Sequence, residues 1–134
     1  MLISFTKELE YTKVYADIEQ IRFPNIRLDY DIQDKDFEIP ALTVQPMVEN
    51  AISHGVRIRE EGFVSVTMRL IDGWHEIIIK GDGKGFDVDA ALNADKTHIG
   101  LRNVRERVEK ICGGTFSVSS VIGEGSDIVI RIPA

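Results

Sequence analysis

Hydrophobic and polar positions follow two different periods in the first part of the chain. From Ser4 to Phe23, apolar residues recur at spacings of three and four, namely Tyr11, Val14, Ile18 and Ile21. This spacing predicts a helix, and Pro24-Asn25 ends it. The next residues alternate between apolar and polar types, which is typical of a half-buried strand; the apolar ones are Ile26, Leu28, Tyr30 and Ile32.

The middle of the chain predicts a second helix followed by a hairpin. We expect the helix to begin at Pro40 and to end at Gly55, with an apolar stripe made of Val44, Met47, Val48, Ala51 and Ile52. Residues 64–70 and 74–79 then alternate around Asp72-Gly73, a dipeptide that favours a tight hairpin turn.

The last part predicts a third helix and two strands. A Gly-rich segment, 81–86, and a polar loop, 87–99, lead into a helical pattern that ends at Gly113-Gly114. Two strands follow, at 115–121 and 127–132. Hairpins joined to amphipathic helices indicate an α+β fold, a two-layer sandwich whose mixed, mostly antiparallel sheet is covered on one face by about three helices.

Composition narrows the possible functions. The 134 residues suit one domain, and the net charge of −6 argues against a nucleic-acid surface. Cys112 is the single cysteine, which excludes a disulfide within the chain and a Cys-rich zinc site. Without a long apolar run or a signal peptide, we expect a part of a protein that is cytoplasmic and not itself embedded in a membrane.

Three segments carry candidate chemistry. On the second helix, Glu49, Asn50 and His54 fall on the side away from the apolar stripe. A carboxylate can orient or deprotonate an attacking group, an amide oxygen suits Mg²⁺, and an imidazole can hydrogen-bond a phosphate. A solvated helix face with a chance cluster would have the same pattern.

The other two segments contain glycine. The sequence GDGKGF from Gly81 lets the backbone approach a ligand closely, although ordinary turns use the same residues. Gly100 and Leu101 begin the third helix, where free N–H groups attract anions. Arg102 and Arg105 add positive charge there, although a basic helix after a loop is also common.

Taken together and in order, these segments resemble the nucleotide-binding boxes of the superfamily that joins gyrase, histidine kinases and mismatch-repair ATPases. PALTVQPMVENAISHGV, from Pro40, is similar to its N box, and GDGKGFD, from Gly81, to its first glycine box. HIGLRNVRERV, from His98, is similar to the second glycine box, and GEGSDIVIRIP, from Gly123, to the closing segment. The LytS-like branch of sensor histidine kinases, which also has a helix like that of residues 8–23, is the most similar.

The resemblance implies ATP and Mg²⁺ as cofactors and assigns roles to residues. Glu49 would be the general base or orienting carboxylate, and Asn50 the Mg²⁺ ligand. The loop 87–99 would be the ATP lid. The remaining nucleotide contacts would come from His54, Asp82, Gly83, Gly85, Phe86, His98, Gly100, Leu101 and Arg102.

The resemblance also implies a larger protein. Residues 1–24 would link the ATP-binding domain, residues 25–134, to an upstream dimerising segment that carries the phosphate-accepting histidine. A response regulator would be the partner of the whole protein, which would be a membrane-anchored sensor. We hypothesise that exposed apolar residues of the first helix belong to a dimer or interdomain contact.

Two departures from the family pattern bear on function. Gly81 stands where the family usually has an aspartate that accepts a hydrogen bond from the adenine amino group. Losing that hydrogen bond costs about 1–3 kcal/mol, although Asp82 could reach the adenine after a small shift of the loop. We therefore hypothesise that ATP binding is weakened but survives. None of the three histidines lies on the first helix, so the chain alone should not autophosphorylate.

Three other functions compete with a histidine kinase domain. A degenerate, non-catalytic nucleotide-binding or relay module is favoured by Gly81 and opposed by the intact Glu49 and Asn50. A serine kinase of the anti-sigma-factor type shares the boxes but not the first helix. A generic α+β interaction domain would require all four boxes to be coincidental.

Overall fold

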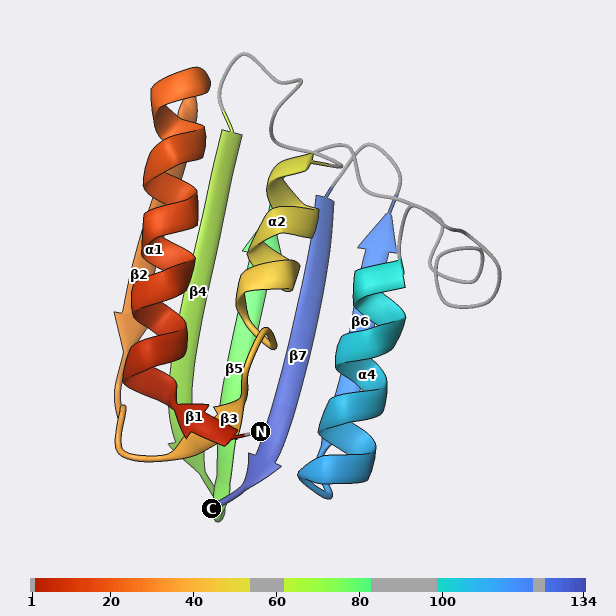
Figure 1. Cartoon of the computed structure of the whole chain (residues 1–134). Coiled ribbons are helices and arrows are strands. Elements are labelled where there is room, and N and C mark those ends of the chain that lie inside the picture. The colour runs from red at the N-terminus through yellow and green to blue at the C-terminus, as the bar shows by residue number, and fades with distance from the viewer. Residues whose placement is uncertain (1, 54–61, 83–98, 122–124) are drawn as a thin grey trace.

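A five-stranded sheet stands behind a layer of three helices in the described part of the chain (Figure 1). The structure, a computed structural model, describes residues 2–53, 62–82, 99–121 and 125–134. In chain order the elements are β1 (Leu2–Ser4), α1 (Phe5–Arg22), β2 (Ile26–Ile32), β3 (Glu38–Pro40), α2 (Gln45–Ser53), β4 (Gly62–Ile71), β5 (Trp74–Gly81), α4 (Ile99–Ile111), β6 (Thr115–Val121) and β7 (Gly125–Pro133).

The sheet is mixed and mostly antiparallel, as the sequence predicts. Its strand order is β2-β4-β5-β7-β6. β2 runs parallel to β4, and the other three pairings are antiparallel. The predicted hairpin is β4–β5, whose turn residues Asp72 and Gly73 both have positive φ. β1 and β3 form a separate small antiparallel pair that the sequence analysis missed.

The core lies between the sheet and the helices. Alternate strand residues face the helices and are buried, among them Val64, Val66, Met68, Ile77, Ile79, Ile128 and Ile130. They meet the apolar stripes of α2 and α4, whose fully or almost fully buried members include Met47, Val48, Ile52, Leu101, Val104 and Val108. Each such side chain contributes roughly 1.5–3 kcal/mol by leaving water. This packing fixes α2 and α4 on one face of the sheet.

The predicted start of the second helix is wrong. Pro40 ends strand β3, which pairs with β1, and α2 begins five residues later at Gln45. Leu42 between them has a φ of 60°, which is not helical. Proline suits a first helical turn, and the proline that occupies this position is Pro46. The predicted end at Gly55 lies outside the described residues.

α1 buries a face different from the one that its apolar spacing suggests. Its buried residues are Phe5, Glu8, Leu9, Thr12, Ala16 and Glu19. The apolar residues at spacings of three and four, Tyr11, Val14, Ile18 and Ile21, are exposed; we call them the α1 stripe. The spacing therefore predicts the helix but not the face that packs on the core.

Glu8 joins α1 to the beginning of α2. This carboxylate is fully buried and accepts hydrogen bonds from four successive backbone N–H groups, those of Leu42, Thr43, Val44 and Gln45, at 2.8–3.0 Å. Free N–H groups at a helix start attract negative charge. Glu8 thus fixes the position of α2 relative to α1. No described helix is long and apolar enough to cross a bilayer.

Candidate functional site

The candidate site lies at the end of the sheet where the inner strand β5 ends and its neighbour β7 begins, beside α2 (Figure 1). Gly81, at the end of β5, faces α2: a Cβ atom added there would lie 3.2 Å from the Ala51 Cβ atom and 3.8 Å from the Ser126 hydroxyl. A Cβ atom on Gly125 would lie 2.2 Å from the Gly81 carbonyl oxygen. Gly125 therefore permits a close approach of the β5 and β7 backbones at this end of the sheet.

Asn50 is the residue of the site with an unmet hydrogen-bonding group. Its side chain lies next to Ala51 on α2 and is only 9% exposed. Its amide nitrogen has no hydrogen-bond partner among the described residues. Buried amides are normally hydrogen-bonded, so a polar ligand at this position would complete the group.

The same amide fits a Mg²⁺ site of the type found with bound nucleotides. Mg²⁺ commonly takes one or two protein oxygens and completes its shell with water and substrate phosphates. Within the described ranges, no group of three or more His, Cys, Asp or Glu side chains forms a metal cluster. The amide oxygen of Asn50 therefore suits a nucleotide-bound ion better than a site built from protein ligands alone.

Glu49 has an environment suited to proton transfer. Burial raises the pKa of its half-buried carboxyl, and the charge of Glu19 raises it further, while a hydrogen bond with Gln45 acts in the opposite direction. A carboxyl with a raised pKa is a better base near neutral pH than an ordinary glutamate. The raised pKa of Glu49 therefore suits the predicted general base, and that role stays a prediction.

Glu19 is a residue of this region that the sequence analysis missed. It lies on α1, it is 5% exposed, and Arg22 approaches its carboxylate to 3.4 Å. A buried carboxylate interrupts the apolar face of a helix, so hydrophobic periodicity gives no signal for it. Its spacing of three residues from Arg22 is the one local sign of a paired acid.

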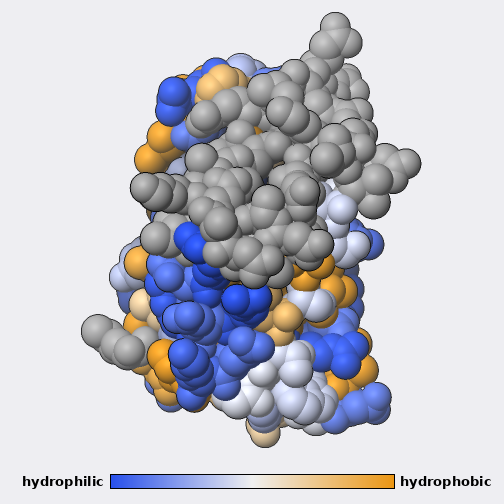
Figure 2. Space-filling model, turned by 90° about the vertical axis from the view of Figure 1, so that its right-hand side faces the viewer, coloured by the Kyte–Doolittle hydropathy of each residue, from blue (hydrophilic) through white to orange (hydrophobic). Residues whose placement is uncertain are grey.

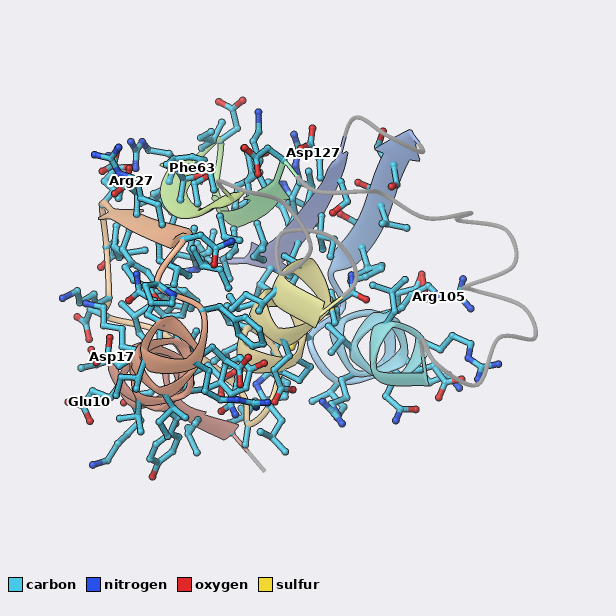
Figure 3. All side chains as sticks on the ribbon, turned by 90° about the horizontal axis from the view of Figure 1, so that it is seen from above. Glu10, Asp17, Arg27, Phe63, Arg105 and Asp127 are labelled. Carbon is cyan, nitrogen blue, oxygen red and sulfur yellow. The ribbon has the colours of Figure 1, made fainter. Side chains whose placement is uncertain are left out.

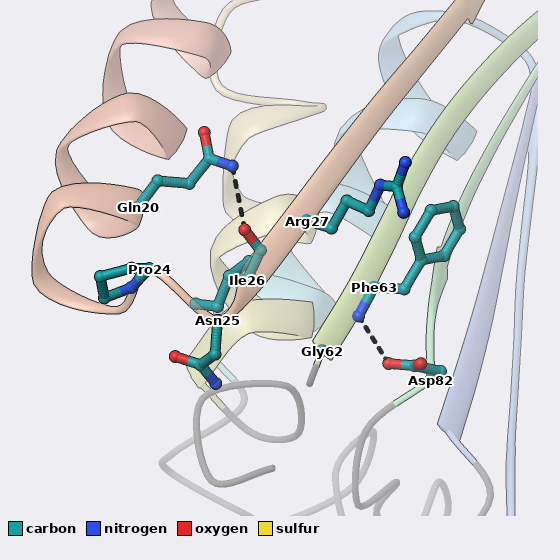
Figure 4. A pocket seen from close by; sticks show the side chains of 8 residues that line it. All are labelled: Gln20, Pro24, Asn25, Ile26, Arg27, Gly62, Phe63 and Asp82. Atoms are coloured by element: carbon teal, nitrogen blue, oxygen red, sulfur yellow. Dashed lines mark hydrogen bonds between the residues drawn. The ribbon is translucent and has the colours of Figure 1, made fainter. Parts of the chain in front are cut away.

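Asp82 is held on the opposite side of the sheet from Gly81. Its carboxylate accepts a hydrogen bond of 2.7 Å from the Phe63 backbone N–H, and its own N–H donates to the Phe63 carbonyl at 3.1 Å. Figure 4 shows this carboxylate at a hollow of about 470 Å³, whose lining is Gln20, Pro24, Asn25, Ile26, Arg27, Gly62, Phe63 and Asp82. This bonding supports a structural role for Asp82, and contact with adenine stays a prediction.

The start of α4 lies beside the start of α2. A Cβ atom on Gly100 would lie 3.9 Å from the Pro46 Cβ atom. Leu101 is a core residue at 2% exposure, so it can offer only its backbone N–H to a ligand. Arg102 is half-buried and already has an interaction within the protein. Figure 2 shows that the described surface on this side is largely hydrophilic, with scattered apolar residues.

The remaining predicted contacts fall outside the described residues. These are His54, Gly83, Gly85, Phe86, His98 and the predicted lid up to residue 98. The structure therefore packs Ala51, the neighbour of Asn50, against Gly81 at the end of β5, and it places Gly100 beside the start of α2. The rest of the predicted site stays a prediction.

A family model and individual relatives of known sequence place the chain in the same family. The profile of "Histidine kinase-, DNA gyrase B-, and HSP90-like ATPase" matches residues 39–134. YwpD of Bacillus subtilis is 31% identical over 96% of this chain, and the sensor histidine kinase YpdA of Escherichia coli is 32% identical over 98%. The sensor protein LytS of Bacillus subtilis is 26% identical over 99%. This chain spans 49% of YwpD, 24% of YpdA and 25% of LytS.

Solved structures show the same fold. The catalytic domain of the histidine kinase ThkA superposes with a TM-score of 0.76 at 18% identity, covering 99% of this chain and 94% of that one. The mycobacterial sensor histidine kinase MprB gives 0.74 at 18% identity, covering 99% and 96%. The predicted fold class and the resemblance to LytS-like sensor histidine kinases are confirmed.

Proposed function

The chain belongs to the family of histidine kinase-, DNA gyrase B- and HSP90-like ATPases. From this premise we propose that it binds Mg·ATP where β5 ends and β7 begins, and that it donates the γ-phosphate to a histidine outside residues 1–134. The parent protein is then a two-component sensor kinase, as the relatives named sensor histidine kinases suggest. The phosphoryl group passes from that histidine to a response regulator.

The buried, unpartnered amide of Asn50 carries this proposal. It lies one residue from Ala51, which packs against the last residue of β5. An unpartnered buried amide N–H group costs about 1–3 kcal/mol, and an acceptor such as a phosphate oxygen of a bound nucleotide would offset that cost. The amide oxygen of the same side chain would hold Mg²⁺, which would neutralise charge on the phosphates.

The protein's own groups position the reactants. α4 presents the free N–H groups of its first turn, including that of Leu101, toward an anion. Glu49 orients the attacking imidazole or accepts its proton, for which its raised pKa suits it. Phosphoryl transfer depends mainly on such positioning and on charge neutralisation.

The proposal extends to the setting of the domain. Residues 1–24 connect it to the upstream phosphate-accepting segment, and the domain works on the cytoplasmic side of a membrane-anchored sensor. The exposed α1 stripe and the buried attachment of Glu8 are consistent with a helix that transmits position to α2.

Calorimetric titration with ATP tests the proposal. We expect heat of binding at up to millimolar nucleotide in Mg²⁺, a loss of at least tenfold in affinity in EDTA, and a similar loss in Asn50→Ala. Asn103→Ala, which removes an exposed amide from α4, is the matched control and should bind as the wild type does. No binding at millimolar Mg·ATP, or equal binding by Asn50→Ala, contradicts the proposal.

A second function, a non-catalytic relay module, is favoured by Gly81 alone. Glycine at the end of β5 leaves no carboxylate facing Ala51. A titration without binding would support this function, because the fold would then transmit position without nucleotide.

A further inference from the structure

Three side chains of different chemistry lie in one row on the face of the sheet that the helices leave uncovered. Arg27 of β2 pairs with Phe63 of β4. Asp82, directly after β5, bonds to the Phe63 backbone through both its carboxylate and its own N–H group. Figure 3 shows Arg27 and Phe63 on the side of the sheet away from the helices. The row therefore presents a cation, an aromatic ring and a carboxylate, in that order.

The row borders the hollow that Figure 4 shows. Its volume of about 470 Å³ lies within the usual range for small-molecule sites, about 300–1,000 Å³. Gln20 at the end of α1 and Pro24 after it line another part of the hollow, and a 3.0 Å hydrogen bond to the Ile26 carbonyl fixes the Gln20 amide. The hollow therefore has defined walls and room for a ligand of the size of a nucleobase.

The two opposite charges of the row argue against a simple ion as the ligand. A small anion near Arg27 would also meet the carboxylate of Asp82, and a small cation near Asp82 would meet the guanidinium. Neighbouring strands lie about 4.8 Å apart, so these two residues, two strands apart, have Cα atoms separated by roughly 10 Å. A ligand that uses both must offer hydrogen-bond acceptors at one edge and donors at another.

Guanine has this arrangement in one flat ring system. Its O6 and N7 atoms accept two hydrogen bonds, the pairing that arginine commonly makes with this base. Its N1–H and N2–H groups donate from the Watson–Crick edge, and a carboxylate has two oxygens that accept. The face of the base can stack on the ring of Phe63, which is 36% exposed. All three members of the row thus find a partner on one base.

Adenine fits the row poorly. It has a bare ring nitrogen at position 1, where guanine has an N–H group, so its Watson–Crick edge turns a lone pair toward the carboxylate of Asp82. Its 6-amino group would also face the guanidinium of Arg27, which only donates. The row therefore distinguishes the two purines.

Asp82 is held in place for such a contact. The 2.7 Å hydrogen bond from the Phe63 N–H group uses one lone pair of its carboxylate, and an ionised carboxylate has about four. The same bond fixes the direction of the side chain before a ligand arrives, which lowers the entropy lost on binding. Gly81, the preceding residue, faces α2, so the row lies on the other side of the sheet from the proposed Mg·ATP site.

We infer that the hollow beside Arg27, Phe63 and Asp82 binds the guanine base of a free nucleotide. The net charge of −6 favours a free nucleotide over a nucleic acid, because nucleic-acid surfaces are usually basic. This site is additional to the Mg·ATP site and does not depend on the proposed function.

Calorimetric titration with GMP in EDTA tests the inference, because the absence of Mg²⁺ separates this site from the proposed Mg·ATP site. We expect GMP to bind at least about tenfold more tightly than AMP, since one bidentate contact to a base typically discriminates by that much. IMP, which lacks the 2-amino group, should have an intermediate affinity. Equal binding of GMP and AMP, or no binding of GMP at millimolar concentration, overturns the inference.

Substitutions identify the residues that hold the base. Arg27→Gln should weaken GMP binding at least about tenfold. Lys110→Gln, which removes an exposed charge from α4, is the matched control and should bind GMP as the wild type does. Asn50→Ala should also keep GMP binding, because Asn50 belongs to the other site. Unchanged binding by Arg27→Gln, or an equal loss in Asn50→Ala, contradicts the inference.

Nuclear magnetic resonance gives the position of the ligand independently of any substitution. On addition of GMP in EDTA, the amide signals of Arg27, Phe63 and Asp82 should shift, whereas those of Gly73 and Gly100 should not. Shifts centred on Gly100 would place the ligand at the start of α4 and would overturn the inference.

Discussion

Neighbouring residues of α2 have different surroundings and different uses. Asn50 is buried beside Ala51 with an unpartnered amide nitrogen, whereas Glu49 senses Glu19 of α1. Consecutive helical residues point about 100° apart, so neighbouring residues of α2 can face the end of β5 and α1 respectively. The proposed Mg²⁺ ligand and the carboxyl group with the raised pKa are therefore adjacent in sequence but have different neighbours.

The raised pKa of Glu49 predicts a pH-dependent stability difference. Raising the pKa in the folded state means that the ionised carboxylate is disfavoured there. Its unfavourable contribution is absent below the ordinary value of 4.5, grows as pH rises from that value, and is complete above the folded-state pKa. Glu49→Gln should therefore be more stable than the wild type at pH 7, with the difference vanishing below pH 4.5.

Thermal unfolding measured across this pH range checks the prediction. Glu106→Gln removes an exposed carboxylate from α4 and is the control, which should show little difference at any pH. A Glu49→Gln variant that is less stable than the wild type at pH 7 would show that the carboxylate is favoured by the fold.

Gly81→Asp should increase the preference for ATP over GTP. A carboxylate there can accept from the adenine amino group, worth about 1–3 kcal/mol, or about tenfold to a hundredfold in affinity for ATP. GTP should gain nothing, because guanine presents an oxygen at that position. The new Cβ atom, 3.2 Å from that of Ala51, requires a small shift of α2.

Competition titrations with the two nucleotides provide the measurement, and Gly81→Asn is the control of equal size without charge. If the Asp and Asn variants gain equally for ATP and GTP, then adenine does not lie against residue 81.

At the scale of elements, α1 and α2 act as one unit. Glu8 holds the segment that leads into α2 through four N–H groups, and the Arg107 guanidinium donates to the Leu42 carbonyl in the same segment. Any displacement of α1 must move these bonds. The position of Asn50, little more than one turn further along α2, therefore depends on α1.

Glu8→Gln tests this attachment. An amide keeps one acceptor oxygen and brings two buried donors without partners, so we expect a loss of about 2–4 kcal/mol in the free energy of unfolding. Urea denaturation measures it. Glu10→Gln, on the exposed side of the same helix, should stay within about 0.5 kcal/mol of the wild type, and a similar value for Glu8→Gln would remove the argument.

The sequence predicts local elements better than contacts between them. Alternation gave β2, β4 and β5, and Gly113, with its φ of 64°, ends α4 as expected. The α1 face could not be predicted, because its buried residues include two carboxylates, those of Glu8 and Glu19. Similarly, β3 is three residues long and depends on a pairing with β1, which no local pattern encodes.

Prediction of the site divides along the same line. Asn50 is predicted from a contiguous motif, and its role stays a prediction; the structure shows its neighbour Ala51 packed against Gly81 at the end of β5. The bonding of Asp82 to Phe63 could not be predicted, since it joins residues 19 positions apart, one on β4 and one just after the end of β5.

At the scale of the whole molecule, the chain has the catalytic fold but no suitable acceptor in its described part. Of its three histidines, only His75 lies there, and it is 7% exposed, stacked on Phe37 at 3.9 Å and 3.4 Å from Asp34. An acceptor must reach the γ-phosphate in line, which this packing prevents for His75.

The isolated chain should therefore bind ATP without becoming phosphorylated. Incubation with γ-labelled ATP and Mg²⁺, followed by gel analysis under alkaline conditions that preserve phosphohistidine, measures this. The control is the same chain joined to the proposed upstream segment that carries the acceptor histidine, and this longer chain should be labelled. Stable label on the isolated chain contradicts the prediction.

Paramagnetic broadening in nuclear magnetic resonance tests the nucleotide site most directly. With Mn²⁺ in place of Mg²⁺ and a non-hydrolysable ATP analogue, we expect the amide signals of Asn50 and Ala51 to broaden first, with Gly100 following, while the distant β4–β5 turn at Gly73 stays sharp. Broadening confined to the hollow around Arg27 and Phe63, or none that requires nucleotide, would contradict a metal–nucleotide site at Asn50.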